Sequence, residues 1–181
     1  MERVLLVLGL LIFSLIFPNP AGAYEKASAS SAFLRKLEVG EDRRVRILNL
    51  FLQSYRSPLA PFSEAFIREA DANTLDWRLL PAIAGVESTF GREIPYNSYN
   101  AWGWGIYGTN VIYFASFDEG IKTIAESLRQ DYVNRWGAKN VYQIGRFYAA
   151  SPTWAGRVVL FMNKIEEFEA KNPSVTLSLT L

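Results

Sequence analysis

The sequence predicts a mainly α-helical domain that contains one small β-hairpin. Half of the 181 residues are hydrophobic and 14% are aromatic, which is enough apolar material for a packed core. Apolar residues recur at helical spacing in several segments, and Ser, Asn, Pro and Gly stand at the ends of those segments. The central stretch 92–116 lacks this period and is rich in glycine and aromatic residues, which favours a hairpin there.

The helices are expected where apolar spacing and end signals coincide. Ser116 to Glu119 form a capping box, Asn140 can cap a short helix, and Ser151-Pro152 can open the last one. The hairpin is expected from 102–107 and 111–114, which flank Gly108-Thr109-Asn110. The expected helices cover residues 41–55, 62–70, 76–91, 116–132, 140–148 and 151–171.

Residues 1–23 have the pattern of an export signal. Arg3 precedes the apolar run 4–17, and Ala21-Gly22-Ala23 supplies the small residues of a cleavage site. We expect cleavage after Ala23 and an extracytoplasmic protein, secreted or associated with the cell wall. The alternative is an uncleaved membrane anchor. Residues 24–57 then form a leader and an N-terminal helix, 58–170 the main domain, and 171–181 a C-terminal tail.

The composition of the chain excludes several classes of catalytic and binding site. The chain has no cysteine and no histidine, which excludes disulfides, zinc sites built on these residues and His-dependent nucleophilic catalysis. Proton transfer in an enzyme would fall to Asp, Glu, Lys or Tyr. The net charge is +1, from 19 basic and 18 acidic residues, and no basic stripe gathers them. We therefore expect no nucleic-acid partner, no cofactor and no metal, and we expect a monomer.

Glu87 lies within the apolar face of the third expected helix. At 100° per residue with Leu79 at zero, Leu80 falls at about 100° and Glu87 at about 80°. A carboxyl group directed toward a core loses hydration, so its pKa is expected to rise. A protonated carboxyl is what cleavage of a glycosidic bond requires, because the leaving oxygen must be protonated. The alternative is a structural glutamate at the edge of this face, which extends to water or pairs with an arginine such as Arg78 or Arg92.

The segment after this helix has the composition of a carbohydrate-binding surface. Aromatic rings contact the C–H faces of sugars, amides bond to their hydroxyl groups, and glycines let a polymer approach the backbone. For Trp102 and Tyr113, a place in the core is an equal alternative. The residues concerned are Tyr96, Tyr99, Trp102, Trp104 and Tyr107, interleaved with Asn97, Asn100, Gly103 and Gly105.

Four motifs occur in order over about residues 60–168: Glu87-Ser88-Thr89-Phe90-Gly91 at the end of an Ala-rich helix, Asn100-Ala101-Trp102-Gly103, the capped helix start 113–121, and Tyr148-Ala149 with the following residues to Ala155. In this order they resemble the glucosaminidase-type domain (mannosyl-glycoprotein endo-β-N-acetylglucosaminidase-like, glycoside hydrolase family 73) of the lysozyme-like superfamily. The helix motif is also similar to that of soluble lytic transglycosylases.

The resemblance implies a lysozyme-like helical fold, peptidoglycan glycan strands as the binding partner, and Glu87 as the catalytic acid. It also implies that Tyr148 lies across the cleft and assists the reaction. The chain departs from the family pattern at 104–107, which leaves the sugar preference open. The expected substrate-binding residues are Ser88, Tyr99, Asn100, Trp102, Trp104, Tyr107 and Trp154.

The expected function is that of a peptidoglycan hydrolase of the endo-β-N-acetylglucosaminidase type. No second carboxylate stands at a motif position, and Glu64, Glu93 and Asp118 are candidates. One alternative is a lytic transglycosylase, in which a group of the substrate itself attacks. The other is a cell-wall-binding module that binds glycan without cleaving it.

Overall fold

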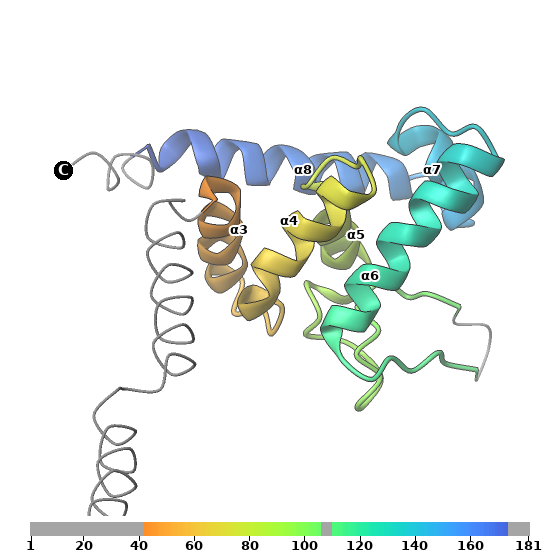
Figure 1. Ribbon diagram of the computed structural model, residues 1–181, viewed down its shortest axis with the longest axis horizontal. Helices are drawn as coiled ribbons and strands as arrows, with labels where there is room; N and C mark the ends of the chain where they lie inside the picture. Colours follow the sequence, from red (N-terminus) through yellow and green to blue (C-terminus); the bar gives the residue numbers. More distant parts are fainter. Residues whose placement is uncertain (1–41, 106–109, 174–181) are drawn as a thin grey trace, which may run out of the picture. The chain divides into compact units, whose positions relative to one another are not determined.

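The computed structural model describes residues 42–105 and 110–173, which belong to one compact and mainly helical unit (Figure 1). The predicted mainly α class is confirmed. Within these ranges no helix is both long and apolar enough to cross a membrane. The elements are α3 (Arg43–Ser54), the short 3-10 helix η2 (Ala60–Phe62), α4 (Ser63–Ala72), α5 (Leu79–Ser88), α6 (Phe117–Ser127), the π-helical η3 (Leu128–Arg135), α7 (Val141–Tyr148) and α8 (Trp154–Lys171).

The predicted caps of α6 and α7 are confirmed. The Ser116 hydroxyl accepts a hydrogen bond from the Glu119 backbone N–H at 3.2 Å. The Asn140 side chain accepts one from the Gln143 N–H at 3.0 Å. Each bond satisfies a backbone donor that has no partner inside its helix, so these residues fix where the two helices begin.

Helix α5 is shorter than predicted at both ends. It begins at Leu79 because Pro81, in the first turn, needs no backbone N–H there. It ends at Ser88 because Thr89 and Phe90 both adopt left-handed backbone angles, with φ of 52° and 59°. The Phe90 N–H donates to the Ala84 carbonyl at 3.0 Å, which closes the helix end ahead of the predicted Gly91.

The predicted hairpin is not confirmed. Its described parts, 102–105 and 110–114, contain no β-strand, and residues 106–109 lie outside the described ranges. Gly103 and Gly105 have φ of +62° and +61°, angles that an extended strand does not use. The buried Asn100 amide joins the two arms instead. It donates to the carbonyls of Trp104 at 2.8 Å and Ile112 at 3.0 Å, and it accepts from the Trp104 N–H.

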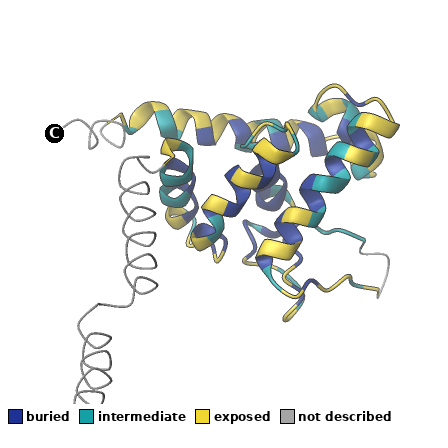
Figure 2. Cartoon of the chain, in the orientation of Figure 1, coloured by how far each residue is buried: buried dark blue, intermediate teal, exposed yellow. Residues whose placement is uncertain are grey.

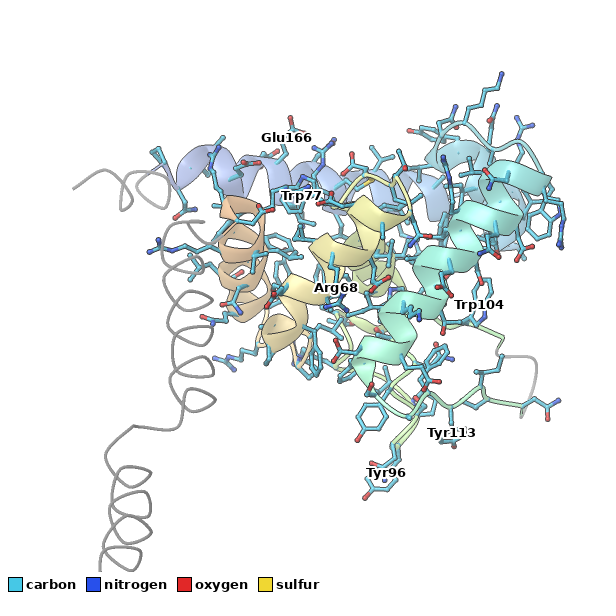
Figure 3. The ribbon with its side chains drawn as sticks, in the orientation of Figure 1. Arg68, Trp77, Tyr96, Trp104, Tyr113 and Glu166 are labelled. Atoms are coloured by element: carbon cyan, nitrogen blue, oxygen red, sulfur yellow. The ribbon has the colours of Figure 1, made fainter. Side chains whose placement is uncertain are left out.

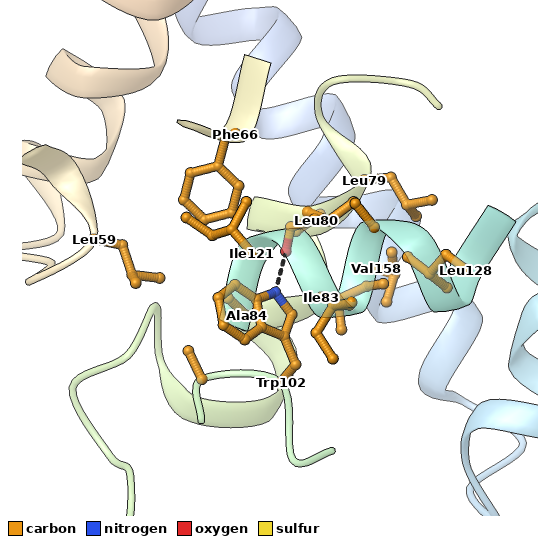
Figure 4. Close-up of a cluster of buried hydrophobic side chains, with 14 of the residues drawn as sticks. Leu59, Phe66, Leu79, Leu80, Ile83, Ala84, Trp102, Ile121, Leu128 and Val158 are labelled. Atoms are coloured by element: carbon orange, nitrogen blue, oxygen red, sulfur yellow. Dashed lines mark hydrogen bonds between the residues drawn. The ribbon is translucent and has the colours of Figure 1, made fainter. Parts of the chain in front are cut away.

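Trp102 lies at the centre of the core, between α4, α5 and α6. Its indole N–H donates to the Leu80 carbonyl at 3.1 Å, so the one polar atom of the ring is satisfied (Figure 4). A Cβ atom at Gly120 of α6 would lie 2.7 Å from this ring, which is why α6 can pack so closely there. The burial pattern of Figure 2 follows, with one buried and one exposed face along each of α4 and α6.

Helix α3 shares this core, although the sequence separated it from the predicted domain 58–170. Leu48 and Leu52 are fully buried, and α3 packs on α4 and α8. Phe90 anchors an aromatic cluster here, with ring centroids 5.6 Å from Phe51 and 4.9 Å from Phe161. The chain after α5 therefore returns to the core at Phe90, and this return positions the end of α5. The predicted signal 1–23 and the tail from 174 lie outside the described residues.

Candidate active site

Glu87 lies in the last turn of α5, and its side chain is exposed. The predicted burial of this carboxyl group is therefore wrong. Leu80 shares its angular sector and is buried, but Leu80 lies seven residues earlier, about 10 Å along the axis. The apolar face of α5 thus continues past the edge of the core at its C-terminal end. A helical projection ignores height along the axis and could not show this.

Glu87 is not a structural ion-pair partner. Arg78 binds Asp76 at 2.7 Å and Glu166 at 2.5 Å, and no described Lys or Arg lies within ion-pair distance of Glu87. The hydrogen-bond partner of Glu87 is Trp154, whose indole N–H donates to Oε1 at 2.5 Å. The carboxylate is thus oriented by a neutral donor rather than neutralised by a cation.

The other carboxylate oxygen faces the backbone of Gly103. A Cβ atom at position 103 would lie 3.0 Å from Glu87 Oε2, closer than most side chains tolerate. The φ of Gly103 is +62°, which L-residues with a side chain rarely adopt. The available space and the backbone angle therefore both favour glycine at position 103, and glycine lets the loop backbone lie against the carboxyl group.

Tyr148, the last residue of α7, stacks on Trp154, the first residue of α8. Their ring centroids are 4.7 Å apart and the rings are inclined by 21°. The Tyr148 hydroxyl donates to the Trp102 carbonyl at 2.9 Å. Burial raises the pKa of Tyr148 well above 10, and the negative charge of Glu87 raises it further. The phenol is thus a neutral donor near Glu87 over the whole physiological pH range.

This raised pKa predicts an alkaline signature for Tyr148→Phe. A proton held more tightly in the folded state stabilises the fold below pH about 10, and this stability is lost as pH rises above it. Near neutral pH, Tyr148→Phe should cost about 1 kcal/mol, because the Trp102 carbonyl loses its donor. The variant should lose less stability than the wild type above pH 10. Melting curves of both proteins across pH test this, and parallel decline of the two contradicts it.

A groove of about 420 Å³ adjoins Glu87. Its lining residue Gly103 lies against the Glu87 carboxyl group, and its lining residue Tyr148 stacks on Trp154, whereas Glu87 itself is not a lining residue. We call this the aromatic groove. Its lining residues are Gly103, Trp104, Gly105, Asp131, Tyr132, Arg135, Trp136, Phe147 and Tyr148.

One wall of the aromatic groove comes from η3, which the sequence did not single out. Regular helical hydrogen bonding gives way to π-type bonding from Leu128 to Arg135, a distortion often found at functional sites. Tyr132 is 5% exposed, and its ring centroid lies 6.2 Å from Trp104 and 5.8 Å from Tyr148. Tyr132 is the last residue of the helix predicted over 116–132, and no sequence pattern singled it out for a site.

Ser88, Asn100 and Trp102 are three of the predicted substrate-binding residues, and all three are buried. The Ser88 hydroxyl donates to the Ala101 carbonyl at 2.7 Å and accepts from the Gly91 N–H at 2.8 Å. Asn100 is 1% exposed and uses its amide to join the loop arms, and Trp102 is 0% exposed. These positions hold the loop against α5. The three side chains therefore position the loop, and they have no exposed surface for a ligand to contact.

The aromatic residues of the loop that are not fully buried lie in two places. Trp104 faces the aromatic groove, whereas Tyr96 and Tyr113 project from a part of the loop well away from it (Figure 3). Tyr99 packs edge-on against Phe117 at 5.2 Å, and Trp154 is buried beneath Tyr148. Tyr107 lies outside the described residues.

The candidates for a second carboxylate lie on exposed surface. Glu64 and Glu93 are exposed, and Asp118 stands in the first turn of α6, 3.9 Å from Arg68. Asp131 is the described carboxylate that lines the aromatic groove, where it pairs with Arg135 at 2.9 Å. In the described ranges, no three Asp or Glu side chains gather as a metal site would need.

Comparison with known proteins returned no family, no curated protein and no solved structure that matches this chain.

Proposed function

We propose that this chain is a peptidoglycan hydrolase that cleaves β-1,4 glycosidic bonds of the glycan strand, of the endo-β-N-acetylglucosaminidase type. The observation that carries the proposal is the meeting of Glu87, Tyr148 and Trp154 beside the aromatic groove. These residues come from α5, α7 and α8 and stand in two motifs that resemble the glucosaminidase family. Their proximity is not a consequence of sequence spacing.

In this proposal, Glu87 donates its proton to the glycosidic oxygen as the C–O bond breaks and positive charge develops on the sugar ring. Trp154 orients one carboxylate oxygen, which leaves the other for the substrate. The carboxyl group is exposed in the free protein, and a bound glycan strand would cover it. The strand would exclude water from the carboxyl group, and the proposed proton transfer takes place in that covered state.

The second half of the reaction needs a nucleophile at the sugar carbon. Arg135 binds the groove carboxylate, Asp131, and Glu87 contacts no other acid among the described residues. The acetamido oxygen of the substrate can attack this carbon and form a cyclic intermediate. Water then opens that intermediate and leaves a reducing end. In a transglycosylase a hydroxyl group of the same sugar attacks instead, and the product has an anhydro end. The ends of the products therefore report the route.

Digestion of purified peptidoglycan followed by mass spectrometry tests the proposal. We expect soluble fragments with reducing N-acetylglucosamine ends. Reducing N-acetylmuramic acid ends would assign the other β-1,4 bond, and anhydro ends would identify a lytic transglycosylase. Binding of the protein to peptidoglycan without release of any fragment would identify a non-cleaving wall-binding module.

A further inference from the structure

Two exposed aromatic residues, Trp136 and Phe147, line the aromatic groove and have no part in the proposed proton transfer. Trp136 follows η3 and is 44% exposed, and Phe147 lies in the last turn of α7 and is 53% exposed. Their ring centroids are 5.0 Å apart and the rings are inclined by 37°. Exposing two large apolar rings side by side is unfavourable in water, so this arrangement indicates a ligand surface.

The two rings are connected to Glu87 by an unbroken series of aromatic contacts. Trp154, which binds Glu87, stacks on Tyr148 at 4.7 Å. Tyr148 contacts Tyr132 at 5.8 Å, and Tyr132 contacts Trp136 edge-on at 4.7 Å. Each ring packs on the next, so aromatic contacts continue from the partner of the carboxyl group to Trp136. Only an extended ligand can contact both ends of this series.

The chemistry of the aromatic groove suits a saccharide. Among the described residues, its lining has aromatic rings, glycines and the Asp131–Arg135 ion pair, and none of these lining residues is Leu, Ile, Val or Met. Flat rings with hydrogen-bonding groups at their edges are how proteins bind sugars, whereas apolar helices and lipids bind among aliphatic side chains. A second pocket, between η3, α7 and α8, shows the contrast, because Leu79, Val133, Ile144 and Met162 line it.

We propose that Trp136 and Phe147 form an outer saccharide subsite, which binds the glycan strand at a distance from the bond that Glu87 cleaves. This inference rests on the proposed function and specifies its substrate as an extended strand. Trp136 supplies the broad ring face, Phe147 holds it in place, and Arg135 and Asp131 offer hydrogen bonds to hydroxyl groups. Contacts at this subsite strengthen the binding of long strands and have no effect on the binding of short ones.

The test measures binding of peptide-free glycan strands to Glu87→Gln protein, which cannot consume them. Adding Trp136→Ala or Phe147→Ala should weaken binding roughly tenfold, the effect of one lost aromatic contact. The matched control is Tyr142→Ala, because Tyr142 is an exposed aromatic residue of α7 that does not line the aromatic groove. In proteins with intact Glu87, the same substitutions should raise KM for long strands and leave kcat unchanged.

The outcomes separate this inference from the proposed function. If Glu87→Gln protein binds no glycan and wild-type protein cleaves none, the proposed function is wrong. If the protein binds and cleaves glycan, and both groove variants match Tyr142→Ala, the subsite alone is wrong. If the groove variants bind intact peptidoglycan more weakly but bind peptide-free strands as the parent does, the rings contact peptide. That result also overturns the saccharide subsite. Melting temperatures within a few degrees of the parent show that each variant is folded.

Discussion

Replacing Glu87 with glutamine should reduce glycan cleavage to a small residual rate and leave the fold intact. Glutamine keeps the shape of the side chain and an oxygen that can accept the Trp154 hydrogen bond, but it has no proton to transfer. Removing a general acid typically costs about 10²–10⁴-fold in rate. Because Glu87 is exposed and pairs with no described cation, the substitution leaves no charge buried and unpaired. Release of soluble fragments from purified peptidoglycan measures the rate, and thermal melting reports the fold.

The matched control for this substitution is Glu167→Gln. Glu167 is an exposed glutamate of α8, 65% exposed at its side chain, and it pairs with Lys171 at 3.7 Å, a contact of little energetic weight. Its replacement should leave the cleavage rate unchanged. Cleavage by Glu87→Gln at a rate near that of the wild type would show that another group supplies the proton, and the proposed mechanism would be wrong.

Local signals in the sequence were sufficient for most of the fold. Ile121 and Ile124 of α6 and Leu128 at the start of η3 recur at helical spacing in the sequence, and all three side chains are fully buried. The caps at Ser116 and Asn140 were predictable because each requires only a side-chain oxygen three residues from a free backbone N–H. Such features depend on neighbours within one or two turns, and the printed sequence contains those neighbours.

Features that depend on contacts between distant segments were not predictable in this way. Phe90 ends α5 early because it packs on rings from α3 and α8, which lie far from it in sequence. The exposure of Glu87 follows from where the core stops along α5. The π-helical turns of η3 place Tyr132 and Asp131 in the aromatic groove, and no residue pattern in 128–135 signals that change of hydrogen bonding.

The site therefore combines predictable residues with an unpredictable arrangement. The sequence singled out Glu87, Tyr148 and Trp104, and the structure brings all three to the same place. It also named Ser88 and Asn100 as ligand contacts, but their polar atoms are used by backbone groups. A buried polar residue in a loop motif fixes the loop, so its presence in a motif does not make it a ligand contact.

Trp102→Ala and Tyr113→Ala should have very different effects on stability, although the sequence left core and site equally open for both residues. Trp102 is 0% exposed, contacts Phe66 at 6.1 Å between ring centroids, and donates to the Leu80 carbonyl. Truncating it removes a large buried ring, leaves a cavity and deprives that carbonyl of its donor. We expect a loss of about 3–5 kcal/mol in the free energy of unfolding. Trp102→Phe should cost less, because it keeps most of the packing.

Tyr113 is the matched aromatic residue, since it lies in the same loop and is 61% exposed. Its truncation should change the free energy of unfolding by no more than about 0.5 kcal/mol, as for other exposed sites. Denaturant unfolding of both variants measures the difference directly. Similar stabilities for Trp102→Ala and Tyr113→Ala would mean that the Trp102 ring does not hold α4, α5 and α6 together. The position of the loop that carries Gly103 and Trp104 to Glu87 would then rest on the Ser88–Ala101 hydrogen bond rather than on the Trp102 ring.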